Sequence, residues 1–188
     1  MSQTSQASRA RLLNLLTERS FARKKVVLAS GRECDFFIDC KQTVLTAEGH
    51  ALVGELMLEA ASDGATFDAI AGVELGGCPL ASAAALISFQ KGNPRDAVYV
   101  RKDAKDHGSK RLLEGDTKLA PGATLVILED VTTTGGSTLK AVAKLREAGY
   151  VVKRVVTLVD RLEGGREAIE AEGLELRALY TRRDFIAD

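Results

Sequence analysis

The sequence predicts an α/β fold with an open, mostly parallel sheet flanked by helices. From residue 67 onward, short apolar segments rich in β-branched residues alternate with helical segments, as in a chain of βαβ units. Residues 125–128 are all apolar, which is typical of a parallel strand buried on both faces. The 188 residues show no internal repeat and are long enough for one domain with a full hydrophobic core.

The first part of the chain predicts two helices with two short strands between them. Leucines at positions 12, 13, 15 and 16 have helical spacing, so a helix is expected over residues 8–18. Strands are expected at residues 26–28 and 36–38, on either side of a turn at Ser30 and Gly31. Thr46 is expected to cap a helix that ends near residue 61.

The rest of the chain predicts five strands and three helices. The strands are expected at residues 67–73, 98–100, 124–128, 151–159 and 174–180, and the helices at 78–89, 136–148 and 166–172. In open α/β sheets, ligands bind at the carboxyl ends of the strands. Glu129 and Asp130 follow one predicted strand, and Asp160 and Arg161 follow another. These polar residues are therefore expected at the same edge of the sheet.

Composition argues against several classes of protein. Lys and Arg together number 26, as do Asp and Glu, so no net charge favours nucleic-acid binding. No apolar segment approaches the roughly 20 residues of a membrane helix, and the polar N-terminus does not resemble a secretion signal. Cys34, Cys40 and Cys78 have no CxxC spacing and are expected to be reduced packing residues. A cytoplasmic protein without membrane or nucleic-acid partners is expected.

Residues 129–137 predict a site for a sugar phosphate. A Thr/Gly-rich turn between a strand and a helix can present backbone N–H groups to a phosphate, although such turns are also common in α/β folds without a ligand. No Lys follows the glycines and no GxGxxG pattern is present, so P-loop and dinucleotide sites are disfavoured. Two adjacent acids suit ribose hydroxyls or a hydroxyl-bound divalent cation. The candidate cradle comprises Glu129, Asp130, Val131, Thr132, Thr133, Thr134, Gly135, Gly136 and Ser137.

A second polar segment concentrates positive charge. Residues 101–111 carry five cations against two acids: the cations are Arg101, Lys102, Lys105, Lys110 and Arg111. Residues 102–118 offer only Leu112 and Leu113 as apolar anchors, and a loop of that length is usually functional or disordered. Taken alone, the segment fits a solvated charged loop equally well. Beside a sugar-phosphate site, it suits a mobile loop that closes over a polyanionic leaving group.

Three segments together resemble the orotate phosphoribosyltransferases, of the type I phosphoribosyltransferase family. They are the Arg-Lys-x-x-Lys-Asp-His-Gly segment at 101–108, the cradle at 129–137 and the Asp160-Arg161 strand end. The Ser30-Gly31-Arg32, Phe36-Phe37 and 72–79 segments fit as well, so the resemblance covers nearly the whole chain. It implies a single phosphoribosyltransferase domain over residues 1–188, with a small N-terminal hood at about residues 1–45.

The resemblance also implies an activity and a cofactor. The family makes orotidine 5′-monophosphate from orotate and phosphoribosyl pyrophosphate (PRPP), with Mg²⁺, in pyrimidine biosynthesis. It implies a homodimer in which the charged loop reaches the partner's site. Magnesium is expected to be held mainly through PRPP, without direct protein ligands.

The resemblance assigns roles to individual residues. PRPP binding falls to the cradle and to Arg101, Lys102, Lys105 and His107, with Lys105 and Asp130 as catalytic groups. Orotate contacts fall to Thr133, Arg161 and Phe37. Two positions depart from the family: Ala29 and Gly76 stand where many members carry Lys, so those contacts do not carry over. Lys41 is a candidate replacement for a lost charge.

The residues suit the implied chemistry. Displacing pyrophosphate at the anomeric carbon develops positive charge on the ribose, which Glu129 and Asp130 can favour while holding the 2- and 3-hydroxyls. Lys105 and His107 can stabilise the departing pyrophosphate, and a guanidinium such as that of Arg161 matches the carboxylate of orotate.

Two other functions compete with this interpretation. Hypoxanthine/guanine phosphoribosyltransferases usually carry an acid where this chain has Thr133, whereas adenine-type members are not excluded by that position. A PRPP-sensing regulator that binds nucleic acid would keep the fold, but it should show a basic surface and could relax the charged loop. The retained Lys105 and His107 and the zero net charge disfavour the regulator.

Overall fold

A six-stranded sheet forms the centre of the molecule in the computed structural model, which describes residues 3–27, 33–103 and 111–186. The strand order is β5-β4-β3-β6-β7-β8, and only β5 is antiparallel to its neighbour. The strands are β3 (Ala69–Val73), β4 (Asp96–Val100), β5 (Leu113–Glu114), β6 (Thr124–Thr132), β7 (Val151–Asp160) and β8 (Glu175–Thr181). The predicted open, mostly parallel sheet is confirmed.

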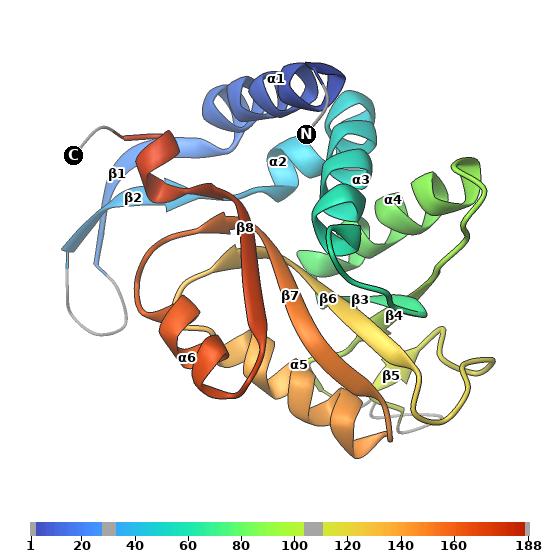
Figure 1. Ribbon diagram of the computed structural model, residues 1–188. Helices are drawn as coiled ribbons and strands as arrows, with labels where there is room; N and C mark the ends of the chain where they lie inside the picture. Colours follow the sequence, from blue (N-terminus) through green and yellow to red (C-terminus); the bar gives the residue numbers. More distant parts are fainter. Residues whose placement is uncertain (1–2, 28–32, 104–110, 187–188) are drawn as a thin grey trace.

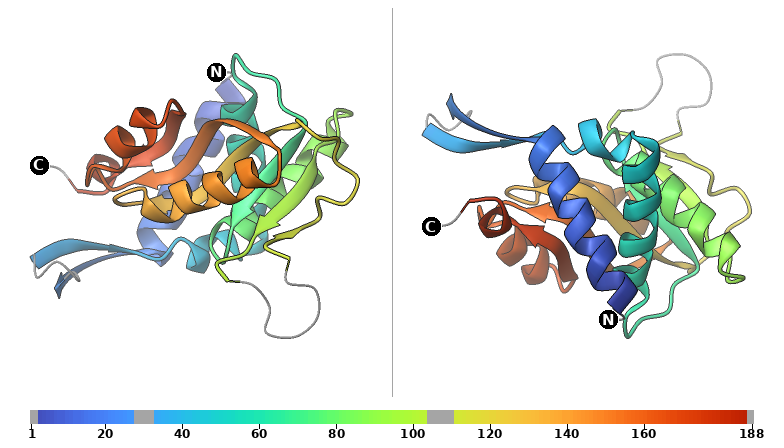
Figure 2. Two further views of the ribbon diagram at one scale, coloured as in Figure 1. Left: turned by 90° about the horizontal axis from the view of Figure 1, so that it is seen from below. Right: turned by 90° about the horizontal axis from the view of Figure 1, so that it is seen from above.

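Helices cover both faces of this sheet (Figures 1 and 2). One face carries α1 (Gln3–Arg19), α3 (Ala47–Ser62) and α4 (Gly77–Gln90), and the other carries α5 (Gly136–Glu147) and α6 (Gly165–Ala171). Alternate residues of β6 serve the two layers, because successive side chains of a strand point to opposite faces. Val126 and Leu128 join the core beneath α3 and α4, while Leu125 and Ile127 join the core beneath α5. The apolar segment of β6 is therefore buried on both sides.

The N-terminal part adds a hairpin that projects beyond the main sheet (Figure 2). It consists of β1 (Phe21–Val27) and β2 (Glu33–Ile38), followed by the short helix α2 (Lys41–Val44). Phe21 and Phe36 of the hairpin pack on Phe185, which follows the 3-10 helix η1 (Arg182–Asp184), with ring centroids 5.6 and 5.8 Å from that ring. Leu28, Ala29 and the predicted Ser30-Gly31-Arg32 turn lie outside the described residues.

Most predicted elements are present, and the one predicted helix cap is formed. The Thr46 side chain accepts a hydrogen bond from the Gly49 N–H at 3.1 Å, so the predicted cap of α3 is confirmed. Cys40 and Cys78 are buried and free, as expected of packing residues, while the side chain of Cys34 lies outside the described part. Among the described residues, no helix is both long and apolar enough to cross a membrane.

Several predicted bounds differ from the structure, among them those of α1 and β1, and two differences near the candidate site have the same physical reason. The strand expected to end at residue 128 continues to Thr132, because β7 pairs with it as far as the Thr132–Asp160 register position. The unstructured loop expected over residues 102–118 contains β5, because Leu113 is buried and pairs with Val100. Both additions come from pairing with a neighbouring strand, which local periodicity does not report.

Candidate active site

A buried carboxyl group lies near the carboxyl end of β6. Glu129 is only 5% exposed, and the Thr138 hydroxyl on α5 donates a hydrogen bond to its Oε2 at 2.9 Å. Burial, and after it the neighbouring charge of Asp130, raises the pKa of Glu129 to about 8. Glu129 can therefore hold a proton near neutral pH, which an exposed glutamate does not.

The adjacent Asp130 occupies space that the chain leaves open for it. Its Oδ1 accepts a hydrogen bond from the Val131 N–H at 2.9 Å. A Cβ atom built on Gly76 would overlap the Asp130 carboxylate, so any side chain at position 76 would displace that group. Burial also raises the pKa of Asp130. In this conformation, the glycine at position 76 leaves the space that the Asp130 carboxylate occupies.

Lys41 stands close enough to the acid pair to affect its charge. Its ammonium forms an ion pair with Asp39 at 2.6 Å. Its positive charge also opposes the burial effect on the pKa of Asp130, while the pKa of Lys41 itself is raised, chiefly by its hydrogen bond to Asp39. The structure therefore brings Lys41, the candidate replacement cation, into the electrostatic neighbourhood of Asp130.

A short turn joins β6 to α5 and exposes the start of that helix. Gly135 adopts a left-handed conformation (φ +79°), which glycine allows without steric cost, and α5 begins at Gly136. Thr134, Gly136 and Ser137 are exposed. The first N–H groups of a helix have no partners within the helix and carry a partial positive charge. The turn can thus receive a phosphate group, as the sequence predicts for the cradle.

Arg161 lies beside this turn, at the end of β7. Its N–H donates to the Thr132 carbonyl at 3.0 Å, so the two strand ends meet at the same edge of the sheet, as expected. Its guanidinium pairs with Glu163 at 2.8 Å and lies 5.7 Å from the ring centroid of Phe36. Phe37, the hairpin residue expected to contact orotate, is 44% exposed. The sequence did not predict the contacts of the Arg161 guanidinium with Phe36 and Glu163.

The charged segment leaves the sheet between β4 and β5. The Arg101 N–H donates to the Leu112 carbonyl at 2.9 Å, which joins the two ends of the segment. The guanidinium of Arg101 lies 3.8 Å from Glu114. Lys105 and His107 fall within residues 104–110, outside the described part of the chain. Their predicted roles therefore remain predictions.

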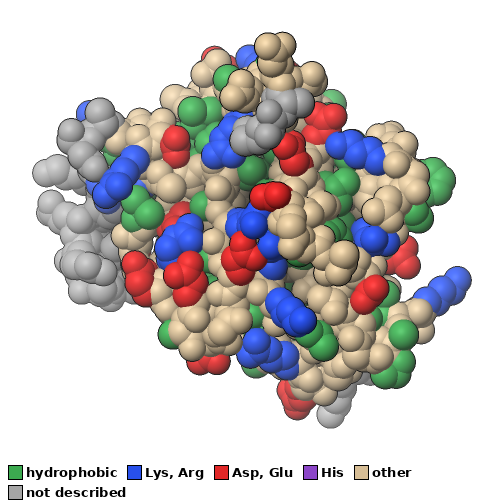
Figure 3. All heavy atoms as spheres, in the orientation of Figure 1, with side chains coloured by type: hydrophobic (Ala, Val, Ile, Leu, Met, Phe, Trp, Pro, Cys, Tyr) green, Lys and Arg blue, Asp and Glu red, His purple; other side chains and the backbone are tan. Residues whose placement is uncertain are grey.

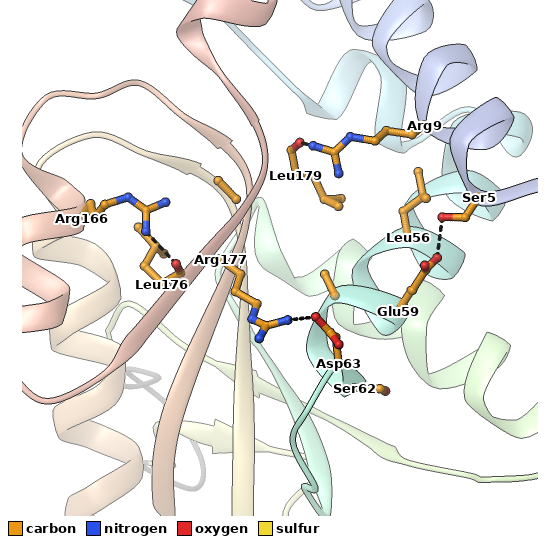
Figure 4. A pocket seen from close by; sticks show the side chains of 12 residues that line it. Ser5, Arg9, Leu56, Glu59, Ser62, Asp63, Arg166, Leu176, Arg177 and Leu179 are labelled. Carbon is orange, nitrogen blue, oxygen red and sulfur yellow. Dashed lines mark hydrogen bonds and ion pairs between the residues drawn. The ribbon is translucent and has the colours of Figure 1, made fainter. Parts of the chain in front are cut away.

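A cavity of about 600 Å³ lies elsewhere, between α1, α3 and β8 (Figure 4). None of the predicted site residues lines it. Its polar groups pair across it: Ser5 donates to Glu59 at 2.7 Å, and Arg177 pairs with Asp63 (Figure 4). On the face shown in Figure 3, basic and acidic side chains are interspersed. Neither feature points to a second polyanion site on the surface shown.

The described residues group too few potential ligands to hold a metal ion by themselves. No group of three or more His, Cys, Asp or Glu side chains in the described part of the chain could hold a metal ion. Glu129 and Asp130 supply two carboxyl groups. Protein-bound calcium takes six to eight oxygen ligands, and magnesium takes a near-octahedral set of oxygen ligands, so this pair alone is too small for either.

Comparison with known proteins places the chain in a family. The family model described as "Phosphoribosyl transferase domain" matches residues 43–172. An orotate phosphoribosyltransferase of Sorangium cellulosum (strain So ce56) is 66% identical over 188 residues, covering 100% of this chain and 98% of that protein. The chain belongs to the orotate phosphoribosyltransferase family.

Solved structures of this family share the fold. The orotate phosphoribosyltransferase of Mycobacterium tuberculosis H37Rv, in complex with Fe(III) dicitrate, superposes with a TM-score of 0.80 and 39% identity over 95% of this chain and 98% of that one. The same enzyme in complex with PRPP gives a TM-score of 0.76 and 35% identity, with the same coverage. The fold that carries the acid pair is thus one in which a relative holds PRPP.

Because the pKa of Glu129 is raised, replacing its carboxyl group with a neutral amide should stabilise the folded protein at high pH and have little effect at low pH. The folded protein keeps this proton up to about pH 8, whereas the unfolded chain loses it near 4.5, so burial of the charge reduces stability progressively as pH rises between these values. Glu129→Gln should therefore raise the free energy of unfolding by up to about 5 kcal/mol at about pH 9 and by little at about pH 4. Urea unfolding across this range measures the difference.

The control for this prediction is Glu147→Gln, which changes an exposed acid at the end of α5. It should leave the free energy of unfolding nearly unchanged at every pH. A Glu129→Gln protein whose stability follows the parent at all pH values would contradict a raised pKa.

Proposed function

We propose that this chain transfers the ribose 5-phosphate group of PRPP to orotate, giving orotidine 5′-monophosphate and pyrophosphate in UMP biosynthesis. One observation carries the proposal: an acid pair, Glu129 buried and Asp130 half-buried, lies near the end of β6, shortly before a Thr/Gly turn and the start of α5. This arrangement stands in a chain 66% identical, over its full length, to an orotate phosphoribosyltransferase. The location that fits this role is the cytoplasm.

The cradle at residues 129–137 binds PRPP in this proposal. The 5-phosphate accepts hydrogen bonds from the backbone of residues 133–137 at the start of α5, because that helix end presents free N–H groups. Glu129 and Asp130 accept hydrogen bonds from the ribose hydroxyls. Hydroxyl donors favour the ionised form of a carboxyl group, so PRPP binding drives Glu129 to lose its proton. The resulting negative charge stabilises positive charge that develops on the ribose.

The charged segment receives the leaving group. Arg101 and Lys102 stand at the end of β4, and Lys105 and His107 follow them in the sequence. Their positive charges stabilise pyrophosphate as its bond to the anomeric carbon breaks and the bond to orotate forms. Lys105 acts as the main catalytic group, and loss of one such donor typically costs about 3 kcal/mol in the barrier.

Orotate is placed by three residues around the same edge of the sheet. The Arg161 guanidinium, beside the turn, suits the orotate carboxylate because its planar donors match two carboxylate oxygens. Thr133 in the turn and the exposed Phe37 on the hairpin supply the remaining contacts.

Magnesium is the proposed cofactor and enters bound to PRPP. When bound, it lowers the charge of the pyrophosphate group. The described residues fit this arrangement, since Glu129 and Asp130 alone do not complete a metal site.

A second copy of the chain completes the proposed enzyme. The outer side of α4 exposes Leu86 (55%) and Phe89 (71%), and Leu75 just before the helix is 67% exposed. Leu86 and Phe89 lie nearly one turn apart on α4, and neighbouring exposed apolar side chains can mark a protein interface. We assign it to a homodimer in which the charged segment of one chain serves the cradle of the other.

The activity is tested by following orotate absorbance after addition of PRPP and magnesium. Orotate should be consumed, while adenine and hypoxanthine should give no nucleotide under the same conditions. Turnover of adenine or hypoxanthine in place of orotate would identify a purine phosphoribosyltransferase. Absence of turnover with all three bases, in a protein that still binds PRPP, would favour a PRPP-sensing regulator.

The shared site is tested by mixing two inactive variants. Lys105→Ala removes the main cation of the charged segment, and Asp130→Asn removes a charge of the cradle. After subunit exchange, a heterodimer holds one site with both parts intact, so each heterodimer should recover up to about half the activity of the parent dimer, and an equimolar mixture up to about a quarter.

The matched control mixes Lys105→Ala with Lys102→Ala, where every site keeps a damaged charged segment. This mixture should stay inactive. If the first mixture also stays inactive after subunit exchange has been demonstrated, each charged segment serves its own chain.

A further inference from the structure

Lys144 on α5 makes a contact that joins the helix beginning at the cradle to the start of the charged segment. Its ammonium donates to the carbonyl of Arg101 at 2.7 Å and to that of Lys102 at 2.6 Å. These carbonyls belong to the point where the chain leaves β4 and the charged segment begins. Lys144 lies in the last turn of α5, the helix whose first turn forms part of the cradle.

The geometry of this contact indicates that Lys144 fixes the direction in which the chain turns away from β4. Successive residues of an extended strand face opposite sides, so one ammonium does not normally reach two consecutive carbonyls of a strand. Lys144 reaches both, which means that it binds the backbone where the strand conformation ends. Hydrogen bonds from a charged donor are about twice as strong as neutral ones, so this contact resists reorientation of the chain.

A second residue holds the same point from another element. Glu74, between β3 and α4, accepts a hydrogen bond from the Lys102 N–H at 2.9 Å, and its own N–H donates to the Val100 carbonyl at 3.0 Å. The first two residues of the charged segment are therefore held by α5 on one side and by the β3–α4 connection on the other.

We infer that Lys144 is a positioning residue for PRPP use, which aims Arg101 and Lys102 at the pyrophosphate group. This inference rests on the proposed function. Lys144 itself contacts backbone carbonyls, so its effect passes through the direction in which the chain leaves β4. Charged groups misplaced by about 1 Å can lower catalysis by up to about a hundredfold. The acceptor orotate, which lies with Arg161 at the end of β7, should be affected much less.

The test is Lys144→Met, which keeps the length and helix preference of the side chain but removes the donor. We expect the KM for PRPP to rise about tenfold, with the KM for orotate within about twofold of the parent value and an unchanged melting temperature. Lys144→Arg, which keeps a charged donor, should restore most of the PRPP affinity. Lys140→Met, an exposed lysine one turn earlier on α5, should behave like the parent.

Amide hydrogen exchange provides a readout that does not depend on activity. Exchange at Lys102 should be faster in Lys144→Met than in the parent and in Lys140→Met. The inference is overturned if PRPP kinetics and Lys102 exchange both match the parent, or if both KM values change equally together with a lower melting temperature. A parent protein without orotate turnover would refute the proposed function, whereas the exchange comparison would still decide the contact of Lys144.

Discussion

The candidate site depends on two adjacent carboxyl groups near the end of β6, of which Glu129 is buried and Asp130 half-buried. In place of water, these carboxyl groups have the Thr138 hydroxyl, the Val131 N–H and the nearby positive charge of Lys41. Burying charge in this way is unfavourable unless partners compensate, and the pKa of Glu129 near 8 expresses that imbalance. The apolar layers on both faces of β6 supply the stability that offsets it. A ligand with hydroxyl donors would provide further partners, which is the role proposed for the pair.

Helix α5 connects the separate parts of this edge. Its start follows the Thr/Gly turn, its Thr138 binds Glu129, and its Lys144 binds the chain where β4 ends. In the β3–α4 connection, Glu74 binds the Lys102 N–H at the start of the charged segment. Gly76, two residues later, leaves space for the Asp130 carboxylate. A small shift of α5 would therefore move the proposed phosphate site, the acid pair and the start of the charged segment together. This linkage gives a physical reason for the proposed dependence of PRPP use on Lys144.

Sequence patterns were sufficient where local chemistry decides the structure. Thr46 capped its helix as predicted, and the acids and Arg161 met at one edge because parallel strands end together. Patterns failed where a distant segment decides. The extension of β6 to Thr132 depends on pairing with β7. The close approach of the Asp130 carboxylate to Gly76 depends on how two separate segments pack. The contact of Lys144 joins residues more than forty positions apart, so no local signal announces it.

The carbon-13 NMR titration of the Glu129 carboxyl group tests the central claim most directly. The signal is assigned by its absence in Glu129→Gln, and the titration is run with and without PRPP and magnesium. In the free protein the midpoint should lie near pH 8, and with PRPP bound it should fall toward the ordinary value of 4.5, because ribose hydroxyls then bind the ionised group. A midpoint near 4.5 in the free protein, or one that PRPP leaves unchanged, would contradict the account.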